Sequence, residues 1–359
     1  MKPFFKNFDW LVVLAITILL LLGLTMIGSV AVGLWPQQAA YALFGVLFFF
    51  LVSRLDYRIF QKLAGWLFLV ALLALLSTFL FGQLTRGSIR WIQIGGFAFQ
   101  PSEMVKPLLI LIFASFVSSQ TAFSLRFFFL NLLLIFVPVL LIFRQPDLGS
   151  SLVVIFVWGA IIFASGLTWR WLLSGLAIAA ASLPVVWQIL KGYQKERIYT
   201  FLRPFSDPLG AGYNMIQSIV AVGSGQLIGR GLGRGTQSHL RFLPERHTDF
   251  IFASLAEELG LVGAGLLILA YGLLLWRILK VSQNSADNFG FLICIGVFSL
   301  IAFQSFINIS MNLGLVPITG ITLPLVSYGG SSLIATMISL GLVESVARKA
   351  KPKEGLEIR

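Results

Sequence analysis

The sequence predicts an all-α, polytopic integral membrane protein with about ten transmembrane helices. Of its 359 residues, 58% are hydrophobic and only 11% are charged, and the mean hydropathy is +0.92. Soluble domains are nearer to half apolar and a quarter charged, so a soluble fold could not bury this much apolar surface. No repeat of fixed period and no soluble segment of domain size are visible. Residues 1–359 are therefore predicted to form a single transmembrane domain.

Apolar runs of spanning length recur along the whole chain, at about 20 residues per crossing. The first run follows Lys2 and Lys6. It is too long for the core of a signal peptide and lacks a small-residue cleavage pattern, so we expect a retained helix. The predicted spans are residues 10–33, 37–53, 59–81, 103–119, 127–143, 148–166, 168–190, 249–279, 289–312 and 331–347.

The short loops indicate the orientation of these helices. Basic residues gather on one side of the predicted membrane, and the short loops of the other side carry only Arg86, Arg90 and Arg144. The positive-inside rule then places both termini in the cytoplasm, with a cytoplasmic tail at about 348–359. The basic residues assigned to the cytoplasmic side are Lys2, Lys6, Arg54, Arg58, Lys62, Arg126, Arg170, Arg277, Lys280, Arg348, Lys349, Lys351, Lys353 and Arg359.

One long loop, at about 191–248 between the seventh and eighth helices, is predicted to lie outside the cytoplasm. It is basic, but long loops translocate regardless of their charge. An anionic partner held at the outer surface or contact with anionic lipid headgroups would each account for this charge. The net charge of +12 is therefore no sign of nucleic-acid binding. The basic residues of the loop are Lys191, Lys195, Arg197, Arg203, Arg230, Arg234, Arg241 and Arg246.

Within this loop, residues 215–222 read as a helix too short to span the bilayer. Glycines and arginines then alternate between Gly223 and Gly235. Backbone amides and guanidinium groups in such a stretch can approach a phosphate closely. Since no strand precedes these glycines, a Rossmann or P-loop nucleotide site is excluded.

The fourth helix predicts a buried ion pair. Pro101 and Ser102 suit a helix start, with the Ser102 hydroxyl as its cap. Glu103 and Lys106 share one helix face. Glu103 alone would be explained by the helix dipole, but Lys106 lies a turn into an apolar helix, where a charge needs a partner or a water-filled cavity. A Glu103–Lys106 pair that lines a cavity is therefore predicted.

Two further outer turns carry helix-start signals. Asp147 is predicted to cap the helix that follows it. The uncharged segment 313–329 is broken by prolines and glycine, and irregular backbone at membrane depth is tolerated only inside protein or along a cavity. Ser331 or Ser332 is expected to cap the last helix, whose N-terminus could offer amides to an anion.

The segment from Pro244 to Gly260 concentrates ionisable side chains just before an apolar run. Asp249 lies at the junction of water and lipid, where a carboxylate is either a helix cap or a reactive group. Glu257 and Glu258 would lie about 12–13 Å deeper by helix rise, and we expect them to brace the bundle interior.

Taken together in their order, five segments resemble the SEDS polymerases of bacterial cell-wall synthesis. Residues 235–238 and 245–249 look like the rod-shape (RodA-type) elongation branch, because the division (FtsW-type) branch tends to have alanine where Arg246 stands. The segments that carry the resemblance are Arg90-Trp91-Ile92 with Gln100-Pro101-Ser102-Glu103, Gln145 to Gly149, Ser206 to Tyr213, Pro244 to Gly260, and Ser327 to Ser331.

The resemblance implies a peptidoglycan glycosyltransferase that polymerises lipid II at the outer face of the bacterial cytoplasmic (inner) membrane during cell elongation. The aspartate considered essential in the family matches Asp249, and the family's buried pair matches Glu103 and Lys106. The resemblance further implies a class B penicillin-binding protein and other elongation-complex proteins as partners. A divalent cation, Mg²⁺ or Mn²⁺, is implied near the pyrophosphate, with no organic cofactor.

The residues also fit this chemistry on their own terms. Inverting transfer needs one general base on the acceptor hydroxyl and positive charge at the departing diphosphate. We assign Asp249 as the base, whereas Lys106 either orients Glu103 or contacts phosphate. A lipid II flippase or a non-catalytic scaffold would suit ten helices too, but the charges concentrate on one outer face, which favours the enzyme. The candidates for binding substrate or diphosphate are Arg90, Arg197, Arg203, Gln217, Arg246, His247, Ser327, Tyr328 and Ser331.

Overall fold

The computed structural model describes residues 8–85, 88–95, 97–119, 125–166, 192–210 and 212–350, with five isolated positions between 167 and 191. The predicted seventh helix, at about 168–190, therefore lies outside the described residues. So do Lys2, Lys6 and Arg86, and the tail beyond residue 350.

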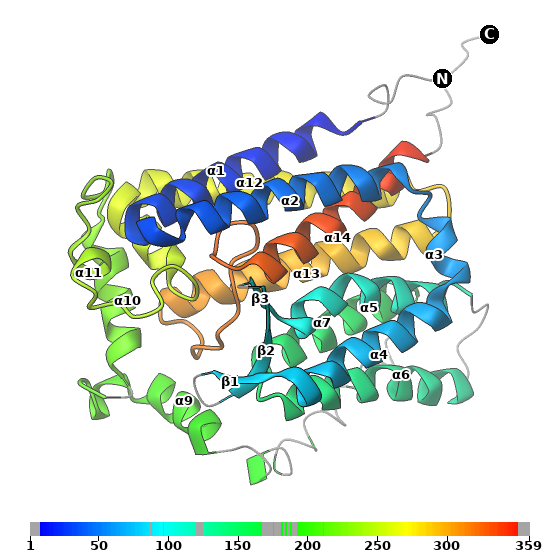
Figure 1. The fold of residues 1–359 in the computed structure, drawn as a ribbon, viewed down its shortest axis with the longest axis horizontal. Helices are drawn as coiled ribbons and strands as arrows, with labels where there is room; N and C mark the ends of the chain where they lie inside the picture. The colour runs from blue at the N-terminus through cyan, green and yellow to red at the C-terminus, as the bar shows by residue number, and fades with distance from the viewer. Residues whose placement is uncertain are drawn as a thin grey trace.

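The described residues form a bundle of long apolar helices (Figure 1). Seven are long and apolar enough to cross a membrane, and two more are shorter. Nine of the ten predicted spans are thus helical, which confirms a polytopic helical membrane protein, while the count of ten rests on the sequence alone. The long helices are α1 (Trp10–Val30), α2 (Trp35–Arg54), α4 (Ala64–Phe81), α5 (Pro101–Ser118), α12 (Ile251–Gln283), α13 (Asn288–Asn312) and α14 (Gly330–Arg348); the shorter apolar stretches are Phe129–Arg144, within α6 (Leu125–Arg144), and α7 (Leu148–Ala164).

The core of the bundle lies along α5, α13 and α14, which are the most buried of the long helices. Helix α14 packs against α2, α5, α12 and α13. Its approach to α2 depends on small residues, because a Cβ added at Gly45 would lie 2.6 Å from Leu333 and one at Gly341 would lie 2.9 Å from the Phe49 carbonyl. Small residues let helix backbones approach closely where lipid gives no hydrophobic drive.

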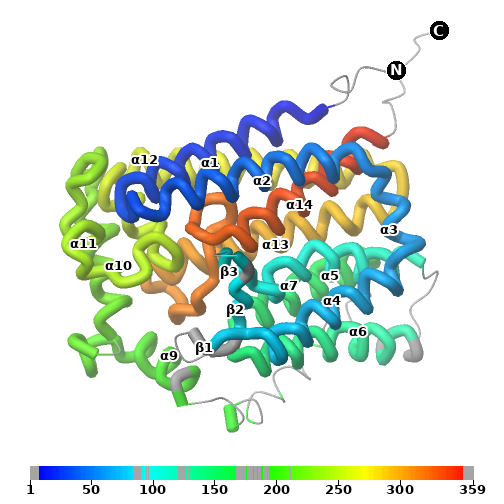
Figure 2. Tube along the Cα trace, viewed as in Figure 1, coloured from blue at the N-terminus to red at the C-terminus, as the bar shows by residue number. Residues whose placement is uncertain are grey.

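The bundle has two different ends (Figure 2). At the termini end, α1 begins and α2, α12 and α14 end, and three ion pairs lie there: Asp9–Arg277, Arg58–Asp287 and Asp56–Lys349. At the loop end lie a small sheet, residues 313–329 and the short helices of the long loop. Those short elements are α9 (Gly192–Leu202), η2 (Pro204–Ser206), α10 (Tyr213–Ser224) and α11 (Thr236–His239); η1 (Val32–Leu34) joins α1 to α2, and α3 (Arg58–Lys62) joins α2 to α4.

The small sheet departs from the all-α prediction. Strands β1 (Gln83–Thr85), β2 (Ser88–Ile94) and β3 (Phe97–Phe99) form an antiparallel meander between α4 and α5. Ile92 pairs with Phe99 and Gln83 pairs with Trp91. Strand pairing satisfies the backbone groups of this connection without a helix. The strands are too short to stand out in a sequence dominated by spanning helices.

Helix α12 is broken, where a continuous span was predicted. Gly260 has φ 65° and ψ −161°, and a Cβ there would lie 2.3 Å from the Gly229 nitrogen. The chain at 226–231 inserts into the break and satisfies the backbone groups that the break leaves open. These hydrogen bonds run from Arg230 N to Glu257 O (3.0 Å), Gly231 N to Glu258 O (3.0 Å), Leu261 N to Gln226 O (2.9 Å) and Val262 N to Leu227 O (3.1 Å).

The helix-cap predictions have mixed outcomes. Asp147 does cap α7, since its carboxylate accepts from the Ser150 N–H at 3.1 Å. The predicted Ser102 cap is wrong, because α5 has Gln100 at its N-cap and the Ser102 hydroxyl donates to Asp147 instead. Helix α14 begins one residue earlier than expected, so neither Ser331 nor Ser332 caps it.

Candidate active site at the loop end

Asp249 is positioned by three elements of the loop end. It lies two residues before α12, and its main-chain carbonyl accepts from Asn308 Nδ2 (3.1 Å) and Asn312 Nδ2 (3.0 Å) of α13. Its side chain faces the irregular segment 313–329, where a Cβ added at Gly320 would lie 3.6 Å from Asp249 Oδ2. The residue is half-buried. Asp249 is thus held through its backbone, and its carboxylate faces Gly320.

Asp249, for which the sequence left a helix cap and a reactive group open, is not the N-cap residue of α12. Phe250 occupies the N-cap of α12, with φ −107° and ψ 23°, and its own side chain makes no capping hydrogen bond. Phe250 alone separates Asp249 from the first residue of α12, and Asp249 Oδ2 faces Gly320 in residues 313–329. The reactive-group interpretation therefore does not compete with a cap.

The segment 313–329 is irregular, as predicted, and is tied to the chain just before Asp249. The Ser327 hydroxyl donates to the Thr248 carbonyl (2.7 Å) and accepts from the Leu323 N–H (2.9 Å). The Tyr328 N–H donates to the His247 carbonyl at 2.8 Å. These bonds satisfy backbone groups inside protein, the condition for irregular chain at membrane depth. Ser327 consequently serves as a support, with its hydroxyl already engaged.

Tyr328 and His247 stand side by side. Their rings make an edge contact at 5.6 Å between centroids, and the Tyr328 hydroxyl donates to Gln37 Oε1 at 2.6 Å. Burial, with a smaller effect of Tyr41, raises the pKa of Tyr328 to about 12. The hydroxyl is therefore protonated at neutral pH and acts as a hydrogen-bond donor.

A cavity of about 600 Å³, here called the arginine cavity, opens beside this pair. Arg246 is fixed in it by a hydrogen bond from Nε to the Val30 carbonyl at 3.0 Å. Burial, and then the charge of Arg241, lowers the pKa of Arg246, yet arginine starts so far above neutrality that it stays cationic. The cavity therefore suits an anion. Its lining consists of Ser29–Leu34, His239, Arg241, Arg246 and His247.

Arg197 lines a second cavity, of about 280 Å³, here called the α9 cavity. Ile318 also lines it, two residues before the Gly320 that Asp249 faces. Arg197 and Asp249 therefore border the same segment, 313–329. The remaining lining residues are Glu196, Thr200, Phe201, Asn214 and Met215.

The other predicted substrate residues lie apart from one another. Arg203 is exposed and precedes η2, and Gln217 is half-buried on α10. Arg90 on β2 has a buried Nε that has no hydrogen-bond partner among the described residues. The Ser331 hydroxyl accepts from the Gln100 N–H at 2.9 Å and ties α14 to the start of α5. The arginines among the candidates for binding diphosphate therefore do not form one cluster, since Arg197 and Arg246 line different cavities.

The predicted Glu103–Lys106 ion pair is present, with Nζ and Oε1 2.5 Å apart and both side chains buried. The Ser150 hydroxyl also donates to Glu103 Oε1, at 3.4 Å. The cavity beside Lys106 holds only about 10 Å³ and is otherwise apolar. That volume is about one water molecule, so substrate cannot enter it. The pair acts on any reaction only through the helices it joins.

The sequence missed several polar residues that hold the site. Asp147 accepts from Gln100 Nε2 and from the Ser102 hydroxyl, both at 3.0 Å, in addition to its cap. Asn308 and Asn312, which hold the Asp249 carbonyl, are amides four residues apart inside an apolar helix. That spacing on one helix face is the signal that would have found them.

Glu257 and Glu258 were expected to brace the bundle, and they instead anchor the long loop. Both are fully buried. Glu257 accepts four hydrogen bonds from residues 236–238, between 2.8 and 3.3 Å. Glu258 accepts from Ser29 Oγ (2.6 Å), His239 Nε2 (2.9 Å) and Gly233 N (3.2 Å). They thereby fix the loop that carries Arg241 and Arg246 into the arginine cavity.

A metal ion would find few protein ligands here. Within the described part of the chain, no three His, Cys, Asp or Glu side chains gather closely enough to hold one. The donor set around Asp249 therefore does not form a metal site by itself.

The helices, Asp249 and the two cavities together define a class of membrane protein. A helical membrane bundle carries at one end a partly exposed aspartate and two cavities lined by arginine, which fits an anionic substrate carried by the membrane. The sequence matches the FtsW/RodA/SpoVE family model, described as cell cycle protein, over residues 5–352. The chain belongs to this family.

Curated relatives and solved structures agree with the family. Peptidoglycan glycosyltransferase MrdB of Escherichia coli (strain K12) is 40% identical over 88% of this chain and 86% of its own. Stage V sporulation protein E of Bacillus subtilis (strain 168) is 36% identical, covering 96% and 98%.

Among solved structures, a chain of a peptidoglycan synthase complex has a TM-score of 0.83 at 37% identity, covering 95% of this chain and 98% of its own. The rod shape determining protein RodA of Thermus thermophilus has a TM-score of 0.74 at 32% identity, covering 98% and 100%. The resemblance to the SEDS family, and to its RodA branch, is confirmed.

Proposed function

We propose that this protein is a peptidoglycan glycosyltransferase that polymerises lipid II into glycan strands during cell elongation, with Asp249 as general base. The observation that carries the proposal is the position of Asp249. Its carboxylate faces, at the loop end, a segment that also borders the α9 cavity, and the arginine cavity is lined by residues two and three positions before it. Relatives named peptidoglycan glycosyltransferases support the same activity.

The reaction follows from these groups. Asp249 takes the proton of the acceptor sugar hydroxyl, whose oxygen then attacks the anomeric carbon of the donor. The bond from that carbon to the diphosphate breaks, and the electron pair leaves with the diphosphate, so the anomeric configuration inverts. Guanidinium groups stabilise the charge that develops on the leaving oxygen. A diphosphate leaves without protonation, so one carboxylate suffices where glycosidases need two.

The arginine cavity is the stronger candidate for the diphosphate. It contains Arg241 and Arg246, and Arg246 is already fixed by its bond to Val30. A fixed donor adds electrostatic stabilisation without reorganisation during the reaction. Arg197 in the α9 cavity then faces another part of the substrate. Arg90, Arg203 and Gln217 stay candidates on the sequence alone.

The membrane side and the partners belong to the same proposal. The positive-inside rule supports the termini end as cytoplasmic, which puts Asp249 on the outer face of the cytoplasmic membrane. A chain that this protein resembles was solved in a peptidoglycan synthase complex. A class B penicillin-binding protein, supplying the transpeptidase, is the proposed partner. A divalent cation, if used, would have to be bound chiefly by the diphosphate, and no step is assigned to it.

One assay separates this function from its alternatives. The purified protein is given labelled lipid II in detergent, with and without a class B partner and with and without a chelator. We expect glycan polymer, whose formation requires this chain. Movement of lipid II across vesicles without polymer would identify a flippase, and partner binding without either activity would identify a scaffold.

A further inference from the structure

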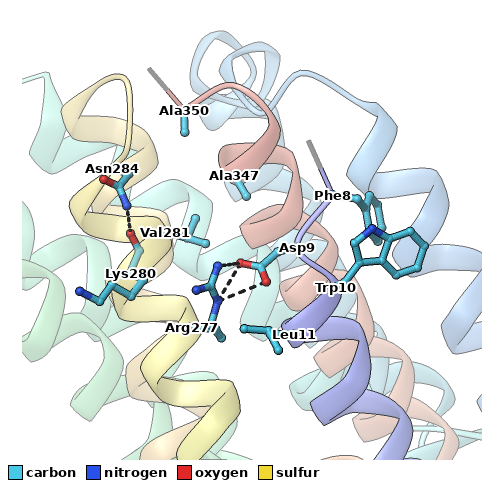
Figure 3. A pocket seen from close by; sticks show the side chains of 10 residues that line it. All are labelled: Phe8, Asp9, Trp10, Leu11, Arg277, Lys280, Val281, Asn284, Ala347 and Ala350. Atoms are coloured by element: carbon cyan, nitrogen blue, oxygen red, sulfur yellow. Dashed lines mark hydrogen bonds and ion pairs between the residues drawn. The ribbon is translucent and has the colours of Figure 1, made fainter. Parts of the chain in front are cut away.

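We propose a second binding site, at the termini end, for the phosphodiester headgroup of an anionic phospholipid. A cavity of about 570 Å³ lies there between the start of α1 and the ends of α12 and α14 (Figure 3). It is on the opposite end of the bundle from Asp249, so it is independent of the proposed reaction. Its polar lining comes chiefly from Asp9, Arg277, Lys280 and Asn284.

The cavity holds one cation in a fixed position. Arg277 donates two hydrogen bonds to Asp9 Oδ2, from Nε at 3.0 Å and from Nη2 at 2.6 Å. Asp9 is held in turn, because its N–H donates to buried Glu344 at 3.1 Å. Figure 3 shows the Arg277 guanidinium and the Asp9 carboxylate facing each other. Arg277 is thus oriented, but its charge is neutralised by Asp9.

Lys280 supplies the charge that remains. It lies one turn beyond Arg277 on α12, is exposed, and has no ion-pair partner among the residues that the structure describes. Asp9 contributes one negative charge and Arg277 and Lys280 one positive charge each, which leaves a single positive charge in the lining. A phosphodiester carries one negative charge. Charge complementarity therefore favours this group, with Lys280 as its ion partner and Arg277 as a supporting donor.

The surroundings indicate a lipid as the source of that phosphodiester. Trp10 is 58% exposed and Trp276 is 49% exposed, on the two helices that flank the opening, and Leu11 beside Trp10 is 40% exposed. Tryptophan gathers at the level of lipid headgroups. The 21 residues of α1 span about 31 Å, which puts Trp10 at the edge of the hydrocarbon layer. The cavity thus opens where headgroup phosphates lie, with apolar surface for acyl chains beside it.

The test measures lipid binding to the full-length protein without lipid II. Native mass spectrometry in a neutral detergent gives the dissociation constant of the tightest phosphatidylglycerol adduct. We expect Lys280→Ala to weaken it about five-fold, the equivalent of about 1 kcal/mol for one lysine near an anionic surface, and Lys280→Arg to restore it. Lys62→Ala is the control, since Lys62 is an exposed lysine at the same end that does not line the cavity.

Three results would overturn the proposal. The first is an unchanged constant for Lys280→Ala, and the second is an equal loss for Lys62→Ala. The third is displacement of the lipid by soluble glycerol phosphate at similar concentration, which would make the ligand an aqueous phosphate and not a membrane lipid. Polymerisation of lipid II is measured separately, so failure here leaves the proposed enzyme activity untouched.

Discussion

Two sets of carboxylates lie within ten residues at the start of α12, and they are in opposite settings. Glu257 and Glu258 are fully buried, and together they accept seven hydrogen bonds from the long loop and α1. Asp249 is half-buried and is held by its main-chain carbonyl. In the first setting the carboxylate oxygens hold the loop, whereas in the second the main-chain carbonyl of a partly exposed residue supplies the anchor.

The two settings suit acidic residues to two different roles in this protein. A buried carboxylate surrounded by donors cannot take a substrate proton without giving up bonds that hold the fold. A carboxylate whose residue is anchored through its main-chain carbonyl can change its protonation state while the backbone stays in place. Catalysis and architecture are thus divided between neighbours on one segment, and substitution should separate them.

The largest effect is expected from Asp249→Asn. We expect polymerisation of lipid II to fall at least about 100-fold, because the amide cannot act as a base. Asparagine has the same shape and leaves the backbone bonds to Asn308 and Asn312 intact, so thermal unfolding in detergent should shift by less than about 2 °C. Asp56→Asn, a carboxylate at the termini end, is the control and should retain activity. Normal polymer from Asp249→Asn would refute the base assignment.

The complementary change is Glu257→Ala. This change leaves the hydrogen-bond donors of residues 236–238 without their acceptor. We therefore expect a loss of about 3 kcal/mol in the free energy of unfolding. Glu257→Gln keeps one acceptor oxygen and should lose less. Thermal unfolding followed by fluorescence measures both. If Glu257→Ala left stability unchanged while polymerisation disappeared, Glu257 would be a reacting group. The structural role assigned to Glu257 would then be refuted.

The same division explains how much the sequence could predict. Run lengths were enough for nine of the ten predicted helices, because bilayer thickness constrains the length of an apolar span. The pair Glu103–Lys106 followed from the cost of an isolated charge in an apolar helix. The break at Gly260 could not be predicted from the sequence, since its backbone partners are residues 226–231 and no residue near Gly260 indicates this pairing. The anchoring roles of Glu257 and Glu258 were hidden for the same reason.

A smaller effect is expected from Arg246→Ala, which tests whether the arginine cavity holds the diphosphate. Loss of one charge-assisted contact should raise the KM for lipid II about ten-fold or more. Arg246→Lys should recover part of the loss, because lysine keeps the positive charge but lacks the planar guanidinium with its several fixed hydrogen-bond donors. Arg197→Ala is the matched change in the α9 cavity. A larger rise in KM for Arg197→Ala than for Arg246→Ala would move the diphosphate to the α9 cavity.

The smallest effect is expected from Tyr328→Phe, which asks whether Asp249 alone sets the pH dependence. The pKa of Tyr328 is raised to about 12, so the folded protein keeps a proton that the unfolded chain begins to lose near pH 10.0. The stabilisation from this difference is complete below that pH and declines as the pH rises toward about 12. Solvent screens the half-exposed ring, so the effect is under about 1 kcal/mol.

Near neutrality, Tyr328→Phe removes one neutral hydrogen bond, to Gln37, worth about 1 kcal/mol. We expect turnover of lipid II to fall about five-fold at most, with an unchanged pH profile between about pH 5 and 9, because the titrating base is a carboxylate. The measurement is the initial rate of polymer formation across that range for both proteins. If the basic limb of the profile moved or vanished in Tyr328→Phe, the tyrosine would be taking part in proton transfer. The division of roles between Asp249 and its buried neighbours would then have to include a third residue.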